Sequence, residues 1–162
     1  MNFLDGLVAK CHVGYVVEDA EVSLKNLQEK LQCALDAQTY LFKPEKVWIC
    51  GVPGQNIELK IAFCRIKDNM TFEYIQPITP EGFHFLSLVS NGEHMNHVCF
   101  ATEDYDGYHK EFEAMGAEFL FEAVANDKLN GYRRCFYAKL PGIPGVLEIL
   151  ENAKPYRENL SK

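Results

Sequence analysis

The sequence lacks a surplus of basic residues, a long apolar run and closely spaced cysteine pairs. Its formal net charge of −7 over 162 residues argues against nucleic acid as a partner, because binding to phosphates needs a basic surface. No apolar run approaches the length of a membrane span, and the N-terminus shows no basic segment followed by an apolar core. We therefore expect a cytoplasmic protein that binds neither membranes nor nucleic acids.

The cysteines do not stand in the CxxC spacing that is typical of thiolate metal sites and redox motifs. Most of them fall in segments that read as strands or helices, where a reduced cysteine serves as a small hydrophobic side chain. We expect free thiols, as is usual in the cytoplasm, while disulfides stay open at this stage. The six are Cys11, Cys33, Cys50, Cys64, Cys99 and Cys135.

The chain has enough apolar residues for one compact core, with 48% hydrophobic and 12% aromatic residues. Alternation, helical spacing and turn residues predict the same order of elements twice, namely a strand, a helix and three strands. The first copy is predicted at 11–17, about 20–33, 47–50, 57–66 and 70–76. The second copy is predicted at 96–102, about 108–115, 119–124, 132–140 and 146–150.

Two segments of the chain are nearly alike and mark the start of each copy. Residues 12–19 read HVGYVVED and residues 97–104 read HVCFATED, with four identical positions. Downstream, each copy carries one carboxylate inside an apolar run, Glu73 in FEYI and Glu148 in LEIL. A lone carboxylate in such a run is costly unless it is paired or bound to a cation. Each repeat therefore supplies one histidine and one carboxylate to a candidate metal site.

Side chains alternate across a strand, so the two histidine segments each have a histidine face and an aromatic face. His12 shares its face with Gly14, and His97 shares its face with Cys99, so both histidines have small neighbours. The aromatic residues of the same segments point the other way, toward the predicted helices. A sheet curved around the histidine face brings two imidazoles and two carboxylates together. Nitrogen and oxygen ligands without thiolate suit a divalent first-row metal with open positions.

Four segments together resemble the vicinal oxygen chelate superfamily, which contains glyoxalase I, methylmalonyl-CoA epimerase, extradiol dioxygenases and bleomycin-resistance proteins. They are HVGYVVED from residue 12, FEYIQP at 72–77, HMNHVCFATED at 94–104 and PGIPGVLEILE at 141–151. The resemblance implies an α+β fold, in which two βαβββ modules form a curved mixed sheet around a central cavity.

The resemblance also implies a domain organisation for nearly the whole chain. A single domain is expected over 1–151, made of module 10–76 and module 95–151 with a joint at 77–94, and followed by a polar tail at 152–162. The two modules pair within one chain or exchange between two chains in this superfamily. A homodimer is the expected assembly.

By motif position, the resemblance implies that His12, Glu73, His97 and Glu148 bind one divalent metal ion, which can be Zn, Ni, Co, Mn or Fe. The implied activity is that of a metal-dependent glyoxalase-type lyase or isomerase, similar to lactoylglutathione lyase. It acts on a small carbonyl substrate through a metal-bound enediolate. Glu148 is the first candidate for the catalytic base and Glu73 the second. Glu58 is a more distant candidate, and an exposed strand carboxylate is the simpler interpretation for it.

Three other functions are compatible with parts of this pattern. An acyl-CoA epimerase of the methylmalonyl-CoA type shares the ligand set and the mechanism. A non-enzymatic binding or resistance protein does not need four ligands, so the intact set counts against it. An extradiol-type dioxygenase uses two histidines and one carboxylate, so the extra Glu73 argues against it.

Several further residues are assigned default roles, and no substrate-binding residue is predicted. Arg133 and Arg134 do not form a glutathione-binding pattern; alternation turns only one of them toward the cavity, and exposure to solvent is the default for both. The histidines outside the ligand positions are His84, His94 and His109. The aromatic residues that either line a pocket or pack in the core are Trp48, Phe63 and Tyr137.

Overall fold

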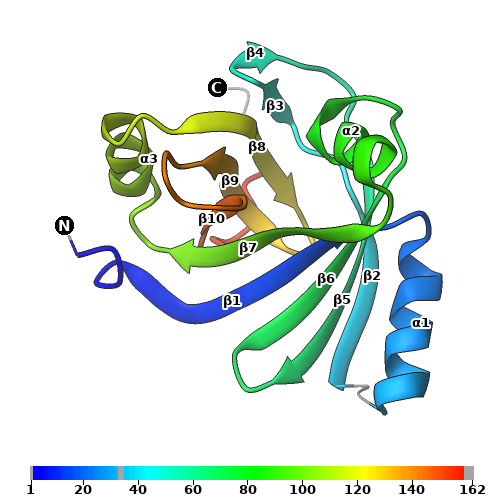
Figure 1. The fold of residues 1–162 in the computed structure, drawn as a ribbon. Helices are drawn as coiled ribbons and strands as arrows, with labels where there is room; N and C mark the ends of the chain where they lie inside the picture. Colours follow the sequence, from blue (N-terminus) through cyan, green and yellow to red (C-terminus); the bar gives the residue numbers. More distant parts are fainter. Residues whose placement is uncertain (1, 33–34, 159–162) are drawn as a thin grey trace.

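A computed structural model describes residues 2–32 and 35–158 of the chain (Figure 1). The helices are α1 (Ala20–Leu31), α2 (Gly82–Asn91) and α3 (Tyr105–Ala114). The strands are β1 (Leu7–Val16), β2 (Leu35–Phe42), β3 (Lys46–Ile49), β4 (Val52–Pro53), β5 (Leu59–Lys67), β6 (Met70–Pro77), β7 (His94–Thr102), β8 (Glu118–Asp127), β9 (Gly131–Lys139) and β10 (Leu147–Glu151). Over these residues, no helix is both long enough and apolar enough to cross a bilayer.

All ten strands form one mixed sheet in the order β2-β5-β6-β1-β7-β10-β9-β8-β3-β4. The two halves meet at β1 and β7, which pair antiparallel, and each of these strands pairs parallel with the last strand of its own half, β6 or β10. The sheet curls, and α1 and α3 lie on its outer side (Figure 1). This arrangement confirms the predicted α+β class, with two βαβββ units around a curved mixed sheet.

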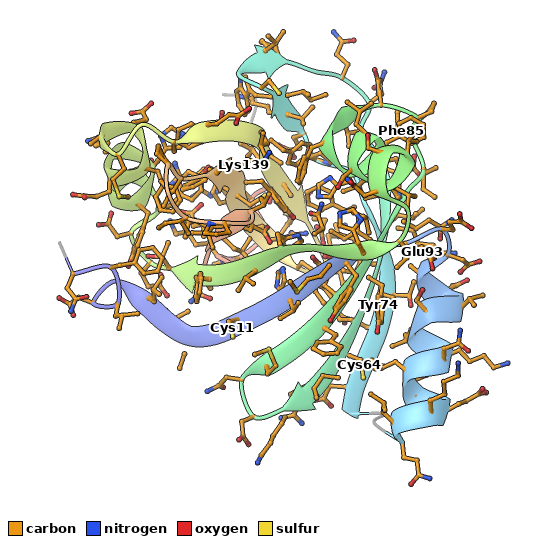
Figure 2. The ribbon with its side chains drawn as sticks, in the orientation of Figure 1. Cys11, Cys64, Tyr74, Phe85, Glu93 and Lys139 are labelled. Carbon is orange, nitrogen blue, oxygen red and sulfur yellow. The ribbon has the colours of Figure 1, made fainter. Side chains whose placement is uncertain are left out.

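The outer face of the sheet packs against the helices through the aromatic residues of the repeated segments. Tyr15 packs with the cluster under α1, which includes Leu24 and Leu27, and Phe100 packs with the cluster under α3. Cys64 is buried in the cluster under α1 (Figure 2). The predicted division into an inner histidine face and an outer aromatic face is therefore correct.

The assignment of strands in the first half is wrong at one point. The second strand of this half is β2, a segment for which no strand is predicted from the sequence, and it pairs with β5. The predicted strand at 47–50 exists as β3, but it crosses to the second half and pairs with β8. Alternation within a four-residue strand does not contain information about its partner, because any sheet edge accepts it.

Helix α1 begins where its sequence predicts and ends slightly earlier. The Asp19 side chain accepts hydrogen bonds from the backbone N–H groups of Glu21 and Val22, as an N-cap does. The helix ends at Leu31, and the predicted end at residue 33 lies outside the described residues. The described cysteines are all free thiols, and Cys33 is outside the described part of the chain.

Candidate metal centre

The four predicted ligands come from four neighbouring strands, which meet at the middle of the sheet. His12 lies on β1, Glu73 on β6, His97 on β7 and Glu148 on β10, and all four are buried. The strand register explains their convergence, since Gly14 of β1 stands between Glu73 and His97 in the two adjacent strands. The structure therefore brings all four side chains together within one chain.

The ligand atoms of this cluster stand at the spacing that a small divalent ion requires. The Nε2 atom of His12 lies 3.2 Å from Nε2 of His97, 3.0 Å from Oε2 of Glu148 and 3.2 Å from Oε2 of Glu73. His97 Nε2 lies 3.1 Å from Glu148 Oε2 and 3.4 Å from Glu73 Oε2. An ion with bonds of about 2.0–2.2 Å has neighbouring ligand atoms about 3 Å apart. The cluster therefore fits a metal without rearrangement.

Hydrogen bonds among the two histidines and two glutamates cannot satisfy all the polar atoms of the cluster. Glu73 Oε2 is buried and accepts no hydrogen bond, although both histidine Nε2 atoms are close to it. Each imidazole nitrogen donates at most one proton, so the two histidines cannot serve both carboxylates and each other. A buried acceptor without a partner is costly, and a cation at the centre removes that cost. This orphaned oxygen is the observation that supports a metal site.

The charges of the cluster influence one another strongly. Burial lowers the pKa of His12, but Cys99, Glu73 and Glu148 outweigh burial and hold this pKa well above its usual value. Burial raises the pKa of Glu73, but the charge of His12 and the close approach of both imidazoles lower it to about 2. The pKa of Glu148 is also lowered, by hydrogen bonds from His12 and His97 that overcome burial. Both carboxylates are thus ionised and attract positive charge to this point.

Residues outside the cluster fix the orientation of His97. Its Nδ1–H donates to Asn96 Oδ1 at 2.9 Å, which leaves Nε2 as the nitrogen with a lone pair for a metal. The Asn96 amide in turn donates to Ser87 Oγ on α2 at 3.0 Å. On the other side, Gly14 makes room for the imidazole, since a Cβ atom at that position would stand 1.9 Å from His97 Cε1.

The cluster lies on the wall of a cavity of about 310 Å³ inside the curl of the sheet. His12, Glu73 and Glu148 line this cavity, and so do Phe63 and Tyr137. The Tyr137 ring contacts His97 edge-on, with ring centroids 4.7 Å apart. The volume is that of a small-molecule site. The arrangement can therefore hold a small ligand directly against a bound ion.

The sequence-based expectations for residues outside the metal cluster are correct for some of these residues and wrong for others. Glu58 does not line the cavity and pairs with Lys43 at 3.3 Å. Trp48 also stands away from the cavity, beside α3. His84 lines the cavity, although it is not in the cluster, and Arg133 is buried at the cavity wall instead of facing solvent. Alternation along β9 was the available signal, because Arg133 shares the face of Tyr137.

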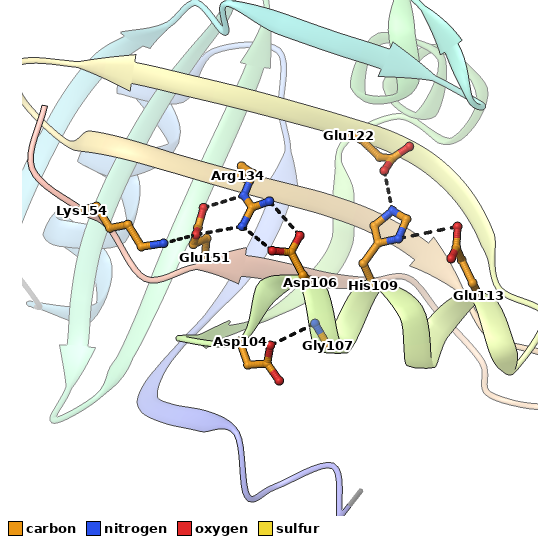
Figure 3. A network of polar contacts seen from close by, with 9 residues as sticks. All are labelled: Asp104, Asp106, Gly107, His109, Glu113, Glu122, Arg134, Glu151 and Lys154. Atoms are coloured by element: carbon orange, nitrogen blue, oxygen red, sulfur yellow. Dashed lines mark hydrogen bonds and ion pairs between the residues drawn. The ribbon is translucent and has the colours of Figure 1, made fainter. Parts of the chain in front are cut away.

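The neighbouring Arg134 belongs to a polar network on the other side of β9 (Figure 3). Its guanidinium donates to Glu151 on β10 at 2.8 Å and to Asp106 on α3 at 2.8 Å. Lys154 also contacts Glu151, and His109 pairs with Glu122. His94 likewise has a structural contact, because it bonds Ser87 Oγ. These contacts connect neighbouring elements, and Glu151 is the one residue among them that also lines the cavity.

Comparison with known proteins agrees with this fold. A family model described as the glyoxalase/bleomycin resistance protein/dioxygenase superfamily matches residues 11–136. No curated protein matches the sequence. Among solved structures, a methylmalonyl-CoA epimerase variant from Streptomyces coelicolor, in complex with 2-nitronate-propionyl-CoA, is similar with a TM-score of 0.62 and 16% identity. The similarity covers 91% of this chain and 99% of that one.

Two further structures share the fold. The methylmalonyl-CoA epimerase from Mycobacterium tuberculosis has a TM-score of 0.62 and 15% identity, over 94% of this chain and 93% of that chain. A mutant 4-hydroxymandelate synthase from S. coelicolor has a TM-score of 0.59 and 14% identity, over 91% of this chain and 49% of that chain. The family match and the fold agree: the chain belongs to the glyoxalase/bleomycin resistance protein/dioxygenase superfamily, the vicinal oxygen chelate proteins.

Proposed function

We propose that the protein is a metal-dependent lyase or isomerase of the glyoxalase type. Such an enzyme moves a proton from the carbon next to a substrate carbonyl to the carbonyl carbon. The observation that carries this proposal is the cluster of two histidines and two glutamates, with an orphaned carboxylate oxygen, on the wall of a small cavity. Members of the superfamily are mostly enzymes and typically bind a divalent metal. The spacing of the four ligand atoms supports metal binding in this protein as well.

The cluster contains the groups that this chemistry needs. A divalent ion held by His12, Glu73, His97 and Glu148 supplies a Lewis acid for the substrate carbonyl. Glu148 is the proposed base that takes the proton from the adjacent carbon and returns it, and Glu73 is the alternative. Both line the cavity, and their lowered pKa values keep them ionised and able to accept a proton.

The carboxylates at the cavity that lie outside the metal cluster are held in ion pairs. Transfer between adjacent carbons on one face requires a single carboxylate, whereas inversion at one carbon requires acid and base groups on both faces. Asp36 pairs with Arg65 at 2.7 Å, and Glu151 pairs with Arg134 at 2.8 Å and with Lys154. Neither is available as a second base in these pairs. The second base of an epimerase would therefore have to be Glu73, which lies in the metal cluster with Glu148.

An acyl-CoA epimerase is the second candidate function. The observation that favours it is the similarity in fold to methylmalonyl-CoA epimerases of matching length. In that case a second group of the cavity has to exchange protons on the face opposite Glu148.

The test combines metal analysis with a substrate screen. We expect purified protein loaded with Zn, Ni, Co, Mn or Fe to retain one ion per chain, and the variants His12→Ala and Glu148→Gln to lose it. Glu58→Gln is the matched control, since that carboxylate is outside the cavity and should not affect the metal. The loaded protein is then assayed with hemithioacetals of several thiols and with acyl-CoA epimers. A chain that retains none of these metals contradicts the proposal, and turnover of acyl-CoA alone selects the epimerase.

A further inference from the structure

Two buried N–H donors at the cavity have no acceptor, and the metal cluster does not explain them. Within the described residues, the buried side-chain atoms without a hydrogen bond are Glu73 Oε2, His84 Nε2, Asn130 Nδ2 and Arg133 Nη2. Asn130 and Arg133 both line the cavity. An unsatisfied buried donor costs free energy, and more so when it is charged. Two such donors on one cavity wall indicate a missing acceptor.

Arg133 is held firmly while this one nitrogen is left without a partner. The residue is 8% exposed. Its Nη1 donates to Asp127 Oδ2 at 2.8 Å and to the Gly131 carbonyl at 3.1 Å, and its guanidinium lies over the Phe42 ring. The guanidinium is therefore oriented before any ligand binds, which reduces the entropy that binding would cost. Its Nη2 is left for a planar oxygen acceptor.

Asn130 is placed next to this arginine by the same aspartate. Asp127 Oδ1 accepts the backbone N–H groups of Leu129 and Asn130, at 3.0 and 2.7 Å, while its Oδ2 accepts from Arg133. One carboxylate thus fixes the turn between β8 and β9 and the arginine together. The Asp127 carboxylate is fully engaged in these contacts, and Asn130 and Arg133, each with one unpaired N–H donor, both line the cavity.

The donor pair and the metal cluster lie at separate positions along the same strand face. Arg133, Cys135 and Tyr137 alternate as buried residues on β9, and Tyr137 contacts the metal cluster through His97. Four residues of extended strand span about 13 Å, and a long arginine side chain shortens the gap. The cavity wall also includes the apolar residues Phe42, Leu59, Ile61 and Phe63. Tyr40 lines the same cavity, and burial raises the pKa of its hydroxyl, while a hydrogen bond with Arg133 acts in the opposite direction.

We propose that Arg133 and Asn130 form an anion subsite, which binds a carboxylate of the substrate while its carbonyl end binds at the metal cluster. The inference rests on the proposed function, and it names the substrate class: an acidic carbonyl compound, in which an apolar spacer separates two neighbouring oxygens from a distal carboxylate. The guanidinium and the amide supply two N–H donors to this carboxylate.

The subsite is tested with pairs of ligands that differ only in the distal carboxylate. Isothermal titration calorimetry of the metal-loaded protein compares 2-oxoglutarate with 2-oxopentanoate, and 2-oxoadipate with 2-oxohexanoate. We expect at least one diacid to bind tenfold or more tightly than its matched monoacid. In Arg133→Met and in Asn130→Asp this preference should fall to within threefold of unity, while monoacid binding is unchanged. Asn130→Asp is nearly isosteric and serves if Arg133→Met does not fold.

The control variant is Lys128→Met, which removes the same charge from an exposed position in the same turn. It should keep the preference for the diacid. A preference near unity for both pairs in the unmodified protein overturns the inference, as does a preference that survives Arg133→Met. These titrations require no turnover, so a failed substrate screen leaves them valid. A missing subsite likewise leaves the turnover of uncharged hemithioacetals unaffected.

Discussion

A single missing side chain opens the space in which the metal ligands meet. Gly14 is the inner neighbour of His12 on β1, and His97 occupies the volume that a Cβ atom at this position would fill. The other small neighbour, Cys99, stands opposite His12 in the register. The small residues of the repeated segments thus provide space beside the imidazoles, as alternation predicts.

The first prediction concerns this space. Gly14→Ala should displace His97 and lower the metal affinity at least tenfold, because the new Cβ would overlap the ring. Cys64→Ala also changes a small buried residue of the sheet, but Cys64 packs under α1 on the outer face, so this variant should alter the affinity by less than threefold. A competition assay with a chelator of known affinity measures both. Equal metal affinities of Gly14→Ala and the unmodified protein would show that the His97 ring can shift and still bind the metal.

His84 gives a prediction about pH. Burial among Phe83, Phe121 and Tyr137, together with the charge of His97, lowers its pKa from 6.5 to about 3, although Glu73 and Glu148 act in the opposite direction. As the pH falls below 6.5, His84 is therefore protonated in the unfolded chain but stays neutral in the folded protein. Stability should rise with pH across this window, and His84 contributes about 2 kcal/mol to the difference between pH 5 and pH 7.

Urea unfolding of the metal-free protein at both pH values measures this contribution. His84→Phe fits the aromatic surroundings and does not titrate, so its loss of stability between pH 7 and pH 5 should be smaller by about 2 kcal/mol. The comparison of the two proteins removes the contribution of all other titrating groups. Parallel pH profiles would contradict the prediction.

Among the elements, β9 carries different chemistry on its two faces. Arg133 faces the cavity, and Arg134 faces α3 and β10 (Figure 3). Arg134 pairs with Glu151, whose side chain is only 1% exposed, and its guanidinium also stacks on Tyr105. Strand alternation alone thus places one of two consecutive arginines at the cavity and the other in a contact between elements.

Arg134→Met should lower the free energy of unfolding by about 2–3 kcal/mol, because it removes a partner from the buried Glu151 carboxylate. Lys154 still contacts this carboxylate, which keeps the loss below that of a fully unpaired charge. The double variant Arg134→Met/Glu151→Gln should recover part of the loss, since no buried charge is left. Urea unfolding at pH 7 completes the double-mutant cycle. Additive losses would mean that the two residues act independently.

Secondary structure was predictable where local pattern decides, and not where a distant partner decides. The start of α1, with its cap at Asp19, follows from residue types and helical spacing. The exchange of β3 to the second half depends on contacts with β8, which no property of residues 46–49 specifies. Alternation shows that Arg133 and Arg134 face opposite ways, but predicting that Arg133 points inward also requires knowing which face of β9 borders the cavity.

At the scale of the whole molecule, the cluster joins the two halves of the chain. Each half contributes one histidine and one glutamate, and the four strands that carry them are adjacent across the β1–β7 seam. The sequence predicted which four side chains converge at the seam, because the repeat pairs each histidine with a downstream carboxylate. The geometry of the cluster could not be predicted without the strand register, which places Gly14 between Glu73 and His97.

A metal bound at the seam should therefore stabilise the entire fold. At a free metal concentration one hundred times the Kd, the gain in unfolding free energy is about 2.7 kcal/mol. Thermal unfolding should shift upward with metal in a single transition, and His12→Ala should abolish the shift. Two separate transitions, with only one of them sensitive to metal, would show that the halves unfold independently.

The crossing of β3 has a consequence for a chain that is divided at the joint. A polypeptide of residues 1–80 carries the β3–β4 hairpin, whose binding edge, β8, belongs to residues 81–162. The two pieces therefore hold each other at two distant places, the β1–β7 seam and the β3–β8 edge. Such fragments are suited to complementation, in which separately expressed halves reassemble and report on their own association.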